Sequence, residues 1–243
     1  MLIHCTAYRE GQRLGELPLT QLSAVLRSSQ PESERPFIWV ALHDATAEEL
    51  APLQAAFGLH PLAVEDALKA HQRPKVEEYG DALFAVLHLL SFEADAPRGE
   101  PSVPPVRQPP RLQAGQLAIF AGPHYVVSVR QHSAQSLAPV RERSEREPEL
   151  LREGPGFVLY ALMDEVVDRY FPLTERIEDE LEAIEKQIFT QGGGREALQR
   201  LYTLKRRLRL LRHAVAPLLE AAARLHSGRV PLLCAPVQHY FRD

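Results

Sequence analysis

Apolar residues recur at three- and four-residue steps through much of the last third of this 243-residue chain. One series runs from Leu159 to Ile188, longer than the roughly 25 residues beyond which a periodic pattern indicates a long packed helix. A second runs from Arg195 to about His226, and Gly192-Gly193-Gly194 between them permits a tight reversal. Because such an apolar stripe must pack against another surface, the pattern predicts two long helices folded into a hairpin. Pro172 predicts a kink in the first helix.

The two predicted helices carry opposite charges. The first is acidic between Asp164 and Glu185, and the second is basic between Arg195 and Arg212. Exposed ion pairs contribute only about 0 to 1 kcal/mol each, so we expect them to fix pairing and orientation while the apolar seam supplies the stability. An alternative interpretation of the basic run is contact with nucleic acid or anionic lipid, which the neighbouring acidic helix disfavours.

The sequence pattern of the first half of the chain predicts an α/β structure. The segment from Phe37 to His43 is a short, β-rich apolar run and predicts a buried strand. Thr46 and Glu49 have the spacing of a capping box, and Gly58 follows where the resulting helix would end. Pro61 suits the first position of a second short helix.

Further strands, a hairpin, a helix and a loop are predicted between Lys75 and Arg146. Strands are predicted at Lys75 to Tyr79 and Ala82 to Phe92, and a hairpin around Gly122-Pro123. A helix is expected from Ala134 to Arg146. The proline-rich stretch from Glu93 to Gly115 has almost no apolar residues and predicts a surface loop.

The predicted fold is therefore α+β. We expect an N-terminal α/β/α sandwich with a mixed sheet in residues 1–153, and a long-helix hairpin with the start of a stalk helix in residues 154–243.

Composition excludes several functional classes. A net charge of −4 argues against a general nucleic-acid binder. Cys5 and Cys234 are too few for a disulfide framework or a tetrahedral zinc site, and they fit a reducing cytosol. No signal peptide is visible, and no apolar run approaches the roughly 18 to 20 residues of a membrane helix, so the chain is expected to be water-soluble. No nucleophile stands beside a base in the sequence, and no enzyme activity is predicted.

Carboxylates are the informative class of polar residue. Glu65 and Asp66 are adjacent in the second short helix, Asp164 lies early in the long helical region, and Asp243 is the last residue. Carboxylates are suitable ligands for hard cations such as Mg²⁺. Each also has an ordinary interpretation. Glu65 and Asp66 can stabilise the dipole of their helix, and Asp164 and Asp243 can belong to a solvated face. Spacing alone favours these ordinary interpretations over metal binding.

A family resemblance changes this balance. The chain resembles the CorA magnesium and cobalt transporter family through several motifs in the family's order. They are FGLHPLAVEDAL (Phe57 to Leu68), HQRPKVEEYGD (His71 to Asp81), SVR (Ser128 to Arg130), PVRER (Pro139 to Arg143), LYALMDEVVDRY (Leu159 to Tyr170), IEDELEAIE (Ile177 to Glu185) and YFRD (Tyr240 to Asp243).

The resemblance implies a cytosolic α/β/α domain at the inner membrane, a funnel of long helices, and assembly as a homopentamer. Family members continue into two C-terminal membrane helices with a G-M-N filter. This chain lacks the stalk continuation, both membrane helices and G-M-N. By itself it is not expected to conduct ions, and any contact with the membrane would run through those absent helices.

The resemblance also implies regulatory cation sites between subunits. Asp66 matches a carboxylate that faces an aspartate of the adjacent subunit, and Asp243 matches that partner. Glu65 and Asp164 match residues of a second, weaker site. The implied function is sensing of Mg²⁺, with Co²⁺ also possible, such that bound cation favours the closed channel.

Three other functions stay open. One is the cytosolic domain of a zinc transporter from the same superfamily. The motifs HQRPKVEEYGD and YFRD argue against it, because they resemble the magnesium and cobalt branch more closely than the zinc branch. Another is a metal-independent adaptor whose helical hairpin binds a partner. An enzyme with an unrecognised pocket ranks third.

Overall fold

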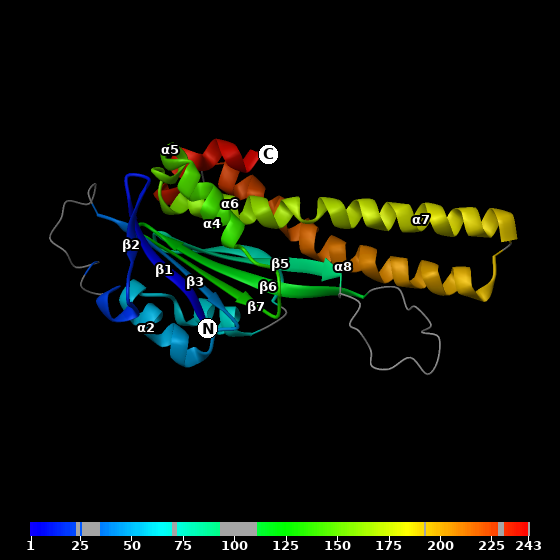
Figure 1. Ribbon diagram of the computed structural model, residues 1–243, viewed down its shortest axis with the longest axis horizontal. Coiled ribbons are helices and arrows are strands. Elements are labelled where there is room, and N and C mark those ends of the chain that lie inside the picture. The colour runs from blue at the N-terminus through cyan, green and yellow to red at the C-terminus, as the bar shows by residue number, and fades with distance from the viewer. Residues whose placement is uncertain are drawn as a thin grey trace.

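A seven-stranded mixed sheet forms the centre of the molecule, with the strand order β2-β1-β3-β7-β6-β5-β4 (Figure 1). The computed structural model describes residues 1–22, 25, 35–69, 72–92, 111–191, 193–227 and 231–242. β3 and β7 pair in parallel, and the other neighbours pair antiparallel, so the predicted mixed sheet is confirmed. The strands are β1 (Leu2–Arg9), β2 (Gln12–Glu16), β3 (Phe37–His43), β4 (Lys75–Tyr79), β5 (Ala82–Phe92), β6 (Leu112–Gly122) and β7 (Tyr125–Gln131).

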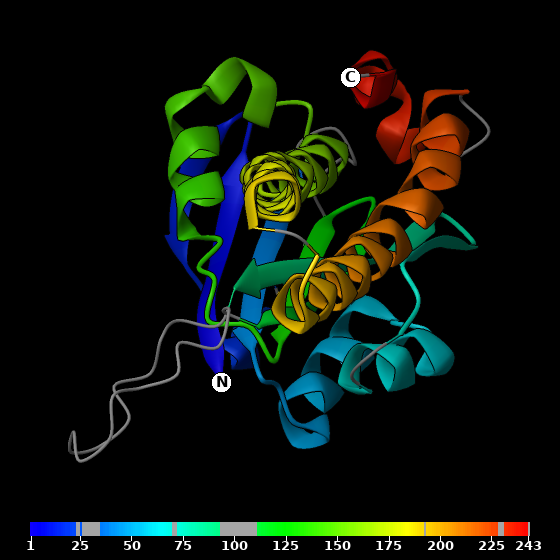
Figure 2. The same ribbon diagram turned by 90° about the vertical axis from the view of Figure 1, so that its right-hand side faces the viewer.

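Helices cover both faces of the sheet (Figures 1 and 2). Side chains alternate along β3: Ile38 and Val40 belong to the buried cluster beneath α2 and α3, whereas Trp39 belongs to the cluster beneath α6. This alternation produces the expected α/β/α layering. The helices are η1 (Leu19–Gln21), α2 (Ala47–Phe57), α3 (Pro61–Leu68), α4 (Ala138–Arg146), α5 (Pro148–Leu151), α6 (Pro155–Asp168), α7 (Phe171–Gln191), α8 (Arg195–His226) and η3 (Leu232–Arg242).

The predicted helix signals around α2 and α3 are confirmed. Thr46 Oγ1 accepts a hydrogen bond from the backbone N–H of Glu49 at 3.3 Å, and the Glu49 carboxylate accepts one from the Thr46 N–H at 3.1 Å. Gly58 ends α2 in the left-handed region, at a φ of 66°. Pro61 opens α3, and the ring of His60 accepts a hydrogen bond from the Leu62 N–H at 3.3 Å.

The predicted long first helix is two helices. α6 ends at Asp168 and α7 begins at Phe171, so Pro172 lies in the first turn of α7, where its missing N–H costs little. Tyr170 lies at the break, and its hydroxyl donates a 2.6 Å hydrogen bond to the backbone oxygen of His88. The predicted kink at Pro172 is therefore a break in the helix just before it.

α7 and α8 form the predicted antiparallel hairpin, which extends beyond the sheet (Figure 1). Ile184 and Leu204 belong to the same buried cluster, which confirms the apolar seam. Arg207 pairs across the hairpin with Glu180. Most other charged side chains of the hairpin are exposed, including the bases at Arg206, Arg209 and Arg212 and the acids at Glu175, Glu178, Asp179, Glu182 and Glu185. Opposite charges of α7 and α8 therefore pair at fewer positions than the composition predicts.

Other predictions need correction. β1 and β2 are strands that the sequence pattern does not predict, because buried β1 includes the polar residue Thr6 as well as apolar ones. The predicted loop is wrong at its end, since Gly115 lies within β6. Residues 93–110 lie outside the described part of the chain. α4 begins at Ala138 rather than Ala134 because Pro139 then occupies its first turn.

The C-terminal segment is helical as far as the described residues go, and the predicted start of a stalk helix stays a prediction. η3 is a 3₁₀ helix where the resemblance implied the start of a stalk helix. Among the described residues, no helix has both the length and the apolar character needed to cross a membrane. The division after residue 153 stays a prediction, and one buried cluster contains both Leu87 of β5 and Leu211 of α8.

Candidate metal centre

α3 positions the adjacent carboxylates Glu65 and Asp66. Ala63, Val64 and Ala67 are buried against the sheet, so the helix turns the two acids toward its outer side. The Glu65 side chain is 54% exposed, and that of Asp66 is 24% exposed. Both carboxylates can therefore reach a ligand or a partner from outside the chain.

Asp66 is held by a basic residue from the neighbouring strand. Lys75 Nζ lies 2.8 Å from Asp66 Oδ2 and 2.7 Å from Glu77 Oε2, so one ammonium group bridges two carboxylates. Burial acts to lower the pKa of Lys75, but its hydrogen bonds to Asp66 and Glu77 outweigh this effect and raise the pKa. The backbone oxygen of Asp66 accepts a 3.0 Å hydrogen bond from the amide of Gln116, which ties α3 to β6.

Glu65 has a more exposed partner at the C-cap of its own helix. Its carboxylate pairs with Lys69 four residues later, and both side chains are more than half exposed. The ion pair raises the pKa of Lys69. An exposed i,i+4 pair constrains Glu65 only slightly.

Asp164 lies on α6, where its carboxylate is 3.3 Å from Arg143 Nη2 of α4. Burial raises the pKa of Asp164, the nearby negative charge of Asp168 adds to this effect, and Arg143 and the hydroxyl of Tyr160 oppose it. Its side chain is 31% exposed. This carboxylate is thus partly desolvated, and a cation close to it would stabilise its charged form, as Arg143 does.

The structure brings together only part of the predicted set. Glu65 and Asp66 are neighbours, whereas Asp164 lies on a helix that covers the opposite face of the sheet (Figure 2). Asp243 lies outside the described residues. The described part of the chain has no group of three histidine, cysteine or acidic side chains arranged to hold a metal ion. A site containing Asp66 and Asp164, or Glu65 and Asp164, would need two copies of the chain.

Lys75 is the residue of this centre that the sequence analysis missed. Lys75 and Glu77 are two apart on β4 and therefore share a face of the strand. That spacing was visible in HQRPKVEEYGD. The contact with Asp66 was not, because it depends on how α3 packs beside β4.

The arrangement defines a class of protein. The sheet, its helix layers and the long hairpin match the soluble domain of CorA from Methanocaldococcus jannaschii with a TM-score of 0.68 and 17% identity, covering 100% of this chain and 90% of that one. The full-length CmaX protein matches with a TM-score of 0.70 and 22% identity, covering 99% and 68%. The cytoplasmic domain of ZntB from Vibrio parahaemolyticus matches with a TM-score of 0.67 and 13% identity, covering 99% and 85%. The protein thus has the CorA soluble-domain fold.

Comparison of the amino-acid sequence with known proteins identifies the family of the chain. The chain belongs to the family described as CorA-like Mg²⁺ transporter protein, whose sequence profile matches residues 34–243. It is 32% identical over 188 residues to the cobalt/magnesium transport protein CorA of Thermotoga maritima, covering 77% of this chain and 50% of that protein. It is also 32% identical over 227 residues to YfjQ of Bacillus subtilis, named as a metal ion transporter, covering 93% and 63%.

The chain therefore spans between half and about two thirds of the length of these two relatives. Family membership confirms the resemblance drawn from the motifs and makes this a chain of a metal-ion transporter family, which is not a class of enzymes.

Proposed function

We propose that this chain is the cation-sensing and gating domain of a magnesium and cobalt transporter. It would lie on the cytoplasmic face of the inner membrane, as part of a homopentamer. The observation that carries the proposal is the family match over residues 34–243, together with carboxylates at the outer side of α3. The proposed regulatory ion is Mg²⁺, and Co²⁺ is a second candidate.

In this proposal, the cation binds between subunits. Asp66 of one subunit would face Asp243 of its neighbour, and Glu65 of one would approach Asp164 of another. The position of α3 and α6 on opposite faces of the sheet supports the second pairing, because one chain cannot bring its own Glu65 to its own Asp164. Mg²⁺ retains several waters and needs few protein oxygens, so two facing carboxylates can hold it through water.

The electrostatic consequence is a switch. Without the cation, facing carboxylates repel and the subunits separate; with it, they attract. Each occupied site adds about 1.4 kcal/mol at a tenfold excess of cation over Kd. Five sites would bias the ring by about 7 kcal/mol, more than the roughly 5.5 kcal/mol that moves a two-state equilibrium from 1:99 to 99:1. High Mg²⁺ would therefore hold the channel closed.

Lys75 adds a requirement to this proposal. Its ammonium group already neutralises Asp66 within the chain, so a cation must displace Lys75 or share the carboxylate with it. Lys75 would then keep Asp66 oriented when Mg²⁺ is scarce and set the concentration at which Mg²⁺ takes over.

The test is self-association of the 243-residue chain as Mg²⁺ is titrated, followed by analytical ultracentrifugation. Mg²⁺ is expected to promote association in the wild type and in Glu77→Ala, and to do so only at higher concentration in Asp66→Ala, where the Glu65–Asp164 pairing alone remains. Glu77→Ala is the matched control, because it also removes a partner of Lys75 but no proposed ligand. Association of Asp66→Ala at the wild-type Mg²⁺ concentration would remove Asp66 from the site.

The zinc-transport alternative stays open because ZntB matches the fold with nearly the same TM-score as CorA, 0.67 against 0.68. The fold therefore does not separate the two branches. The same titration with Co²⁺ and Zn²⁺ does, since a preference for Zn²⁺ over Mg²⁺ at every concentration would support the alternative. Association that responds to none of the three ions would support the metal-independent adaptor.

A further inference from the structure

A series of hydrogen bonds crosses the sheet between the break at α6–α7 and α3. At one end, the hydroxyl of Tyr170 donates a 2.6 Å bond to the backbone oxygen of His88 on β5. Tyr170 belongs to the buried cluster beneath α6, whereas α3 packs on the opposite face of the sheet (Figure 2). The bonds that continue from His88 therefore connect the two helix layers through the sheet itself.

His88 is the residue at which this series passes through the sheet. Phe84 and Val86 of β5 belong to the cluster beneath α2 and α3, so alternation along the strand places the His88 ring on that face. There, His88 Nε2 lies 2.8 Å from the backbone oxygen of Gln72. Because a carbonyl oxygen only accepts, Nε2 carries the proton and donates it. A shift of the His88 backbone would thus move its ring as well.

Gln116 joins Gln72 to α3. It lies directly opposite His88 in the β5–β6 register, so the two side chains share a face of the sheet. Gln116 Oε1 accepts a 3.0 Å bond from the Gln72 N–H, and Gln116 Nε2 donates a 3.0 Å bond to the backbone oxygen of Asp66. Asp66 lies in the last turn of α3, where backbone oxygens lack partners within the helix. Gln116 therefore holds both the end of α3 and the segment before β4.

Burial makes these bonds depend on one another. Gln116 is 2% exposed, so a bond lost there leaves a buried polar group unpaired. Both of its partners are backbone groups, and its amide fits one of them only while the other stays in place. Tyr170, His88, Gln72, Gln116 and Asp66 thus form one connected set, which we call the cross-sheet network.

Tyr170 also sets the beginning of α7. Its backbone oxygen accepts hydrogen bonds from the N–H groups of Leu173 at 3.1 Å and Thr174 at 3.0 Å. The side chain of Tyr170 is therefore anchored to β5, while its main chain starts the first helix of the hairpin.

We propose that the cross-sheet network couples α3 energetically to the start of the hairpin, with His88 as the joint. Loosening either end loosens the other, because His88 and Gln116 keep their bonds only while both ends hold their positions. This coupling belongs to the folded chain and needs no cation. Its regulatory role rests on the proposed function: a cation that fixes Asp66 would steady the first turn of α7, so the hairpin would respond to occupancy of the metal centre.

The experiment is amide hydrogen exchange of the 243-residue chain in EDTA. Rates are expressed relative to β7, which is buried along its whole length, so that a loss of global stability does not count as coupling. Tyr170→Phe should speed relative exchange in α3 and at Gln72 about three- to tenfold, the effect of about one hydrogen bond. Because coupling is reciprocal, Gln116→Leu should speed exchange in the first turn of α7.

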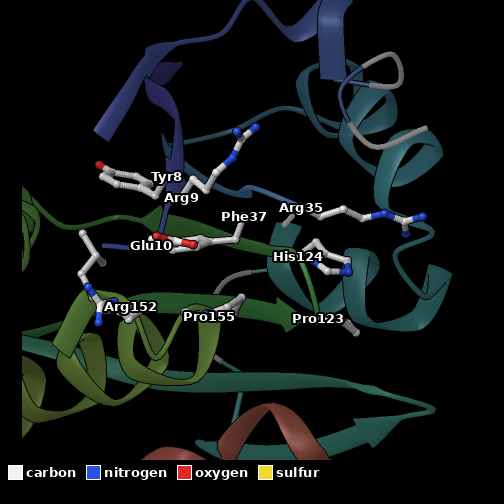
Figure 3. A pocket seen from close by; sticks show the side chains of 11 residues that line it. Tyr8, Arg9, Glu10, Arg35, Phe37, Pro123, His124, Arg152 and Pro155 are labelled. Atoms are coloured by element: carbon white, nitrogen blue, oxygen red, sulfur yellow. The ribbon is translucent and has the colours of Figure 1, made fainter. Parts of the chain in front are cut away.

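Tyr8→Phe is the matched control. Tyr8 is buried, and its hydroxyl also donates a 2.6 Å hydrogen bond, in this case to Glu145. Figure 3 shows Tyr8 beside Arg9 and Phe37 at a hollow of about 490 Å³, whose described lining contains no member of the cross-sheet network. Tyr8→Phe should therefore leave the relative exchange of α3 unchanged.

Variants of His88 test the joint itself. His88→Leu removes the donor to Gln72, whereas His88→Gln retains a side-chain N–H, so only the leucine variant should speed exchange in α3. In the His88→Leu background, Tyr170→Phe should have no further effect on α3, because the connection is already cut.

Three results would overturn the coupling. They are unchanged α3 exchange in Tyr170→Phe, equal acceleration in Tyr8→Phe, or the same effect of Tyr170→Phe with and without His88→Leu.

Addition of Mg²⁺ tests the regulatory role separately. Exchange in the first turn of α7 should become slower in the wild type and less so in Tyr170→Phe, and equal slowing in both would overturn that role. Mg²⁺ that changes neither exchange nor self-association would overturn the metal proposal, while the coupling measured in EDTA would stand. The two proposals therefore fail on different observations.

Discussion

Lys75 Nζ lies 2.8 Å from Asp66 Oδ2, so the carboxylate expected to bind Mg²⁺ already has a cationic partner in its own chain. The same ammonium group contacts Glu77 at 2.7 Å. A divalent cation and Lys75 would therefore compete for the same negative charge. In the proposed function, this competition would set the Mg²⁺ concentration at which the cation takes over Asp66.

Lys75→Gln should raise the apparent Mg²⁺ affinity about three- to tenfold. Loss of the ammonium group leaves Asp66 and Glu77 uncompensated, and partly exposed charges at this separation interact by roughly 1 kcal/mol. The measurement is the Mg²⁺ concentration at half-maximal self-association. Lys69→Gln is the control, since it removes only the exposed partner of Glu65. A weaker or unchanged affinity in Lys75→Gln would contradict the competition.

Acidification from pH 7 to pH 5 should destabilise the chain through His4 by up to about 2 kcal/mol. Burial lowers the pKa of His4 from 6.5 to about 4, and the nearby charges of Arg141 and Arg13 add to this effect. The unfolded chain then binds more protons between these pKa values, so the stability is complete above pH 6.5 and is lost as the pH falls toward 4.

Urea denaturation of His4→Gln at pH 7 and pH 5 measures this contribution. The variant should lose less stability on acidification than the wild type does. His213→Gln, at an exposed position on α8, should keep the wild-type pH dependence. Identical pH profiles for wild type and His4→Gln would show that another group is responsible.

Gly156→Ala should loosen η3. The added Cβ would meet the backbone oxygen of Leu233 at 2.1 Å, and backbone atoms can be relieved only by a shift of η3 or α6. Overpacking of this kind costs about 1 to 3 kcal/mol, which exceeds the roughly 1 kcal/mol that alanine gains over glycine in a helix. Hydrogen exchange should become faster in residues 232–242. Gly193→Ala, where a Cβ meets nothing within 4 Å, is the neutral control.

Glu180→Gln should destabilise the hairpin by about 1 to 3 kcal/mol. It removes the Glu180 carboxylate that pairs with the Arg207 guanidinium, which is 5% exposed. Burial lowers the pKa of Arg207, and the charge of Glu180 opposes that shift. The double variant Glu180→Leu/Arg207→Met should recover most of the loss, because it removes both charges. Thermal unfolding of the single and double variants measures the difference, and additive losses would argue against a coupled pair.

Local sequence signals predicted the elements around the candidate site. Thr46, Gly58 and Pro61 fix the limits of α2 and α3 through backbone hydrogen bonds and allowed φ values, which depend on near neighbours in the chain. The apolar period predicted α8 and the hairpin for the same reason. β1 was missed because the polar residue Thr6 interrupts its apolar residues, and Thr6 is buried only because β1 lies between β2 and β3.

The sequence by itself determined the family, the helix and strand signals, and the acidic residues that this family resemblance selects. Only the tertiary structure decided that Lys75 neutralises Asp66, that Glu65 and Asp164 lie on opposite sides of the sheet, and that Tyr170 is bonded to His88. The physical reason is the distance along the chain over which each kind of interaction acts. Helix caps and apolar periods act over a few residues, whereas these side chains meet across segments whose separation is set by packing of the whole sheet.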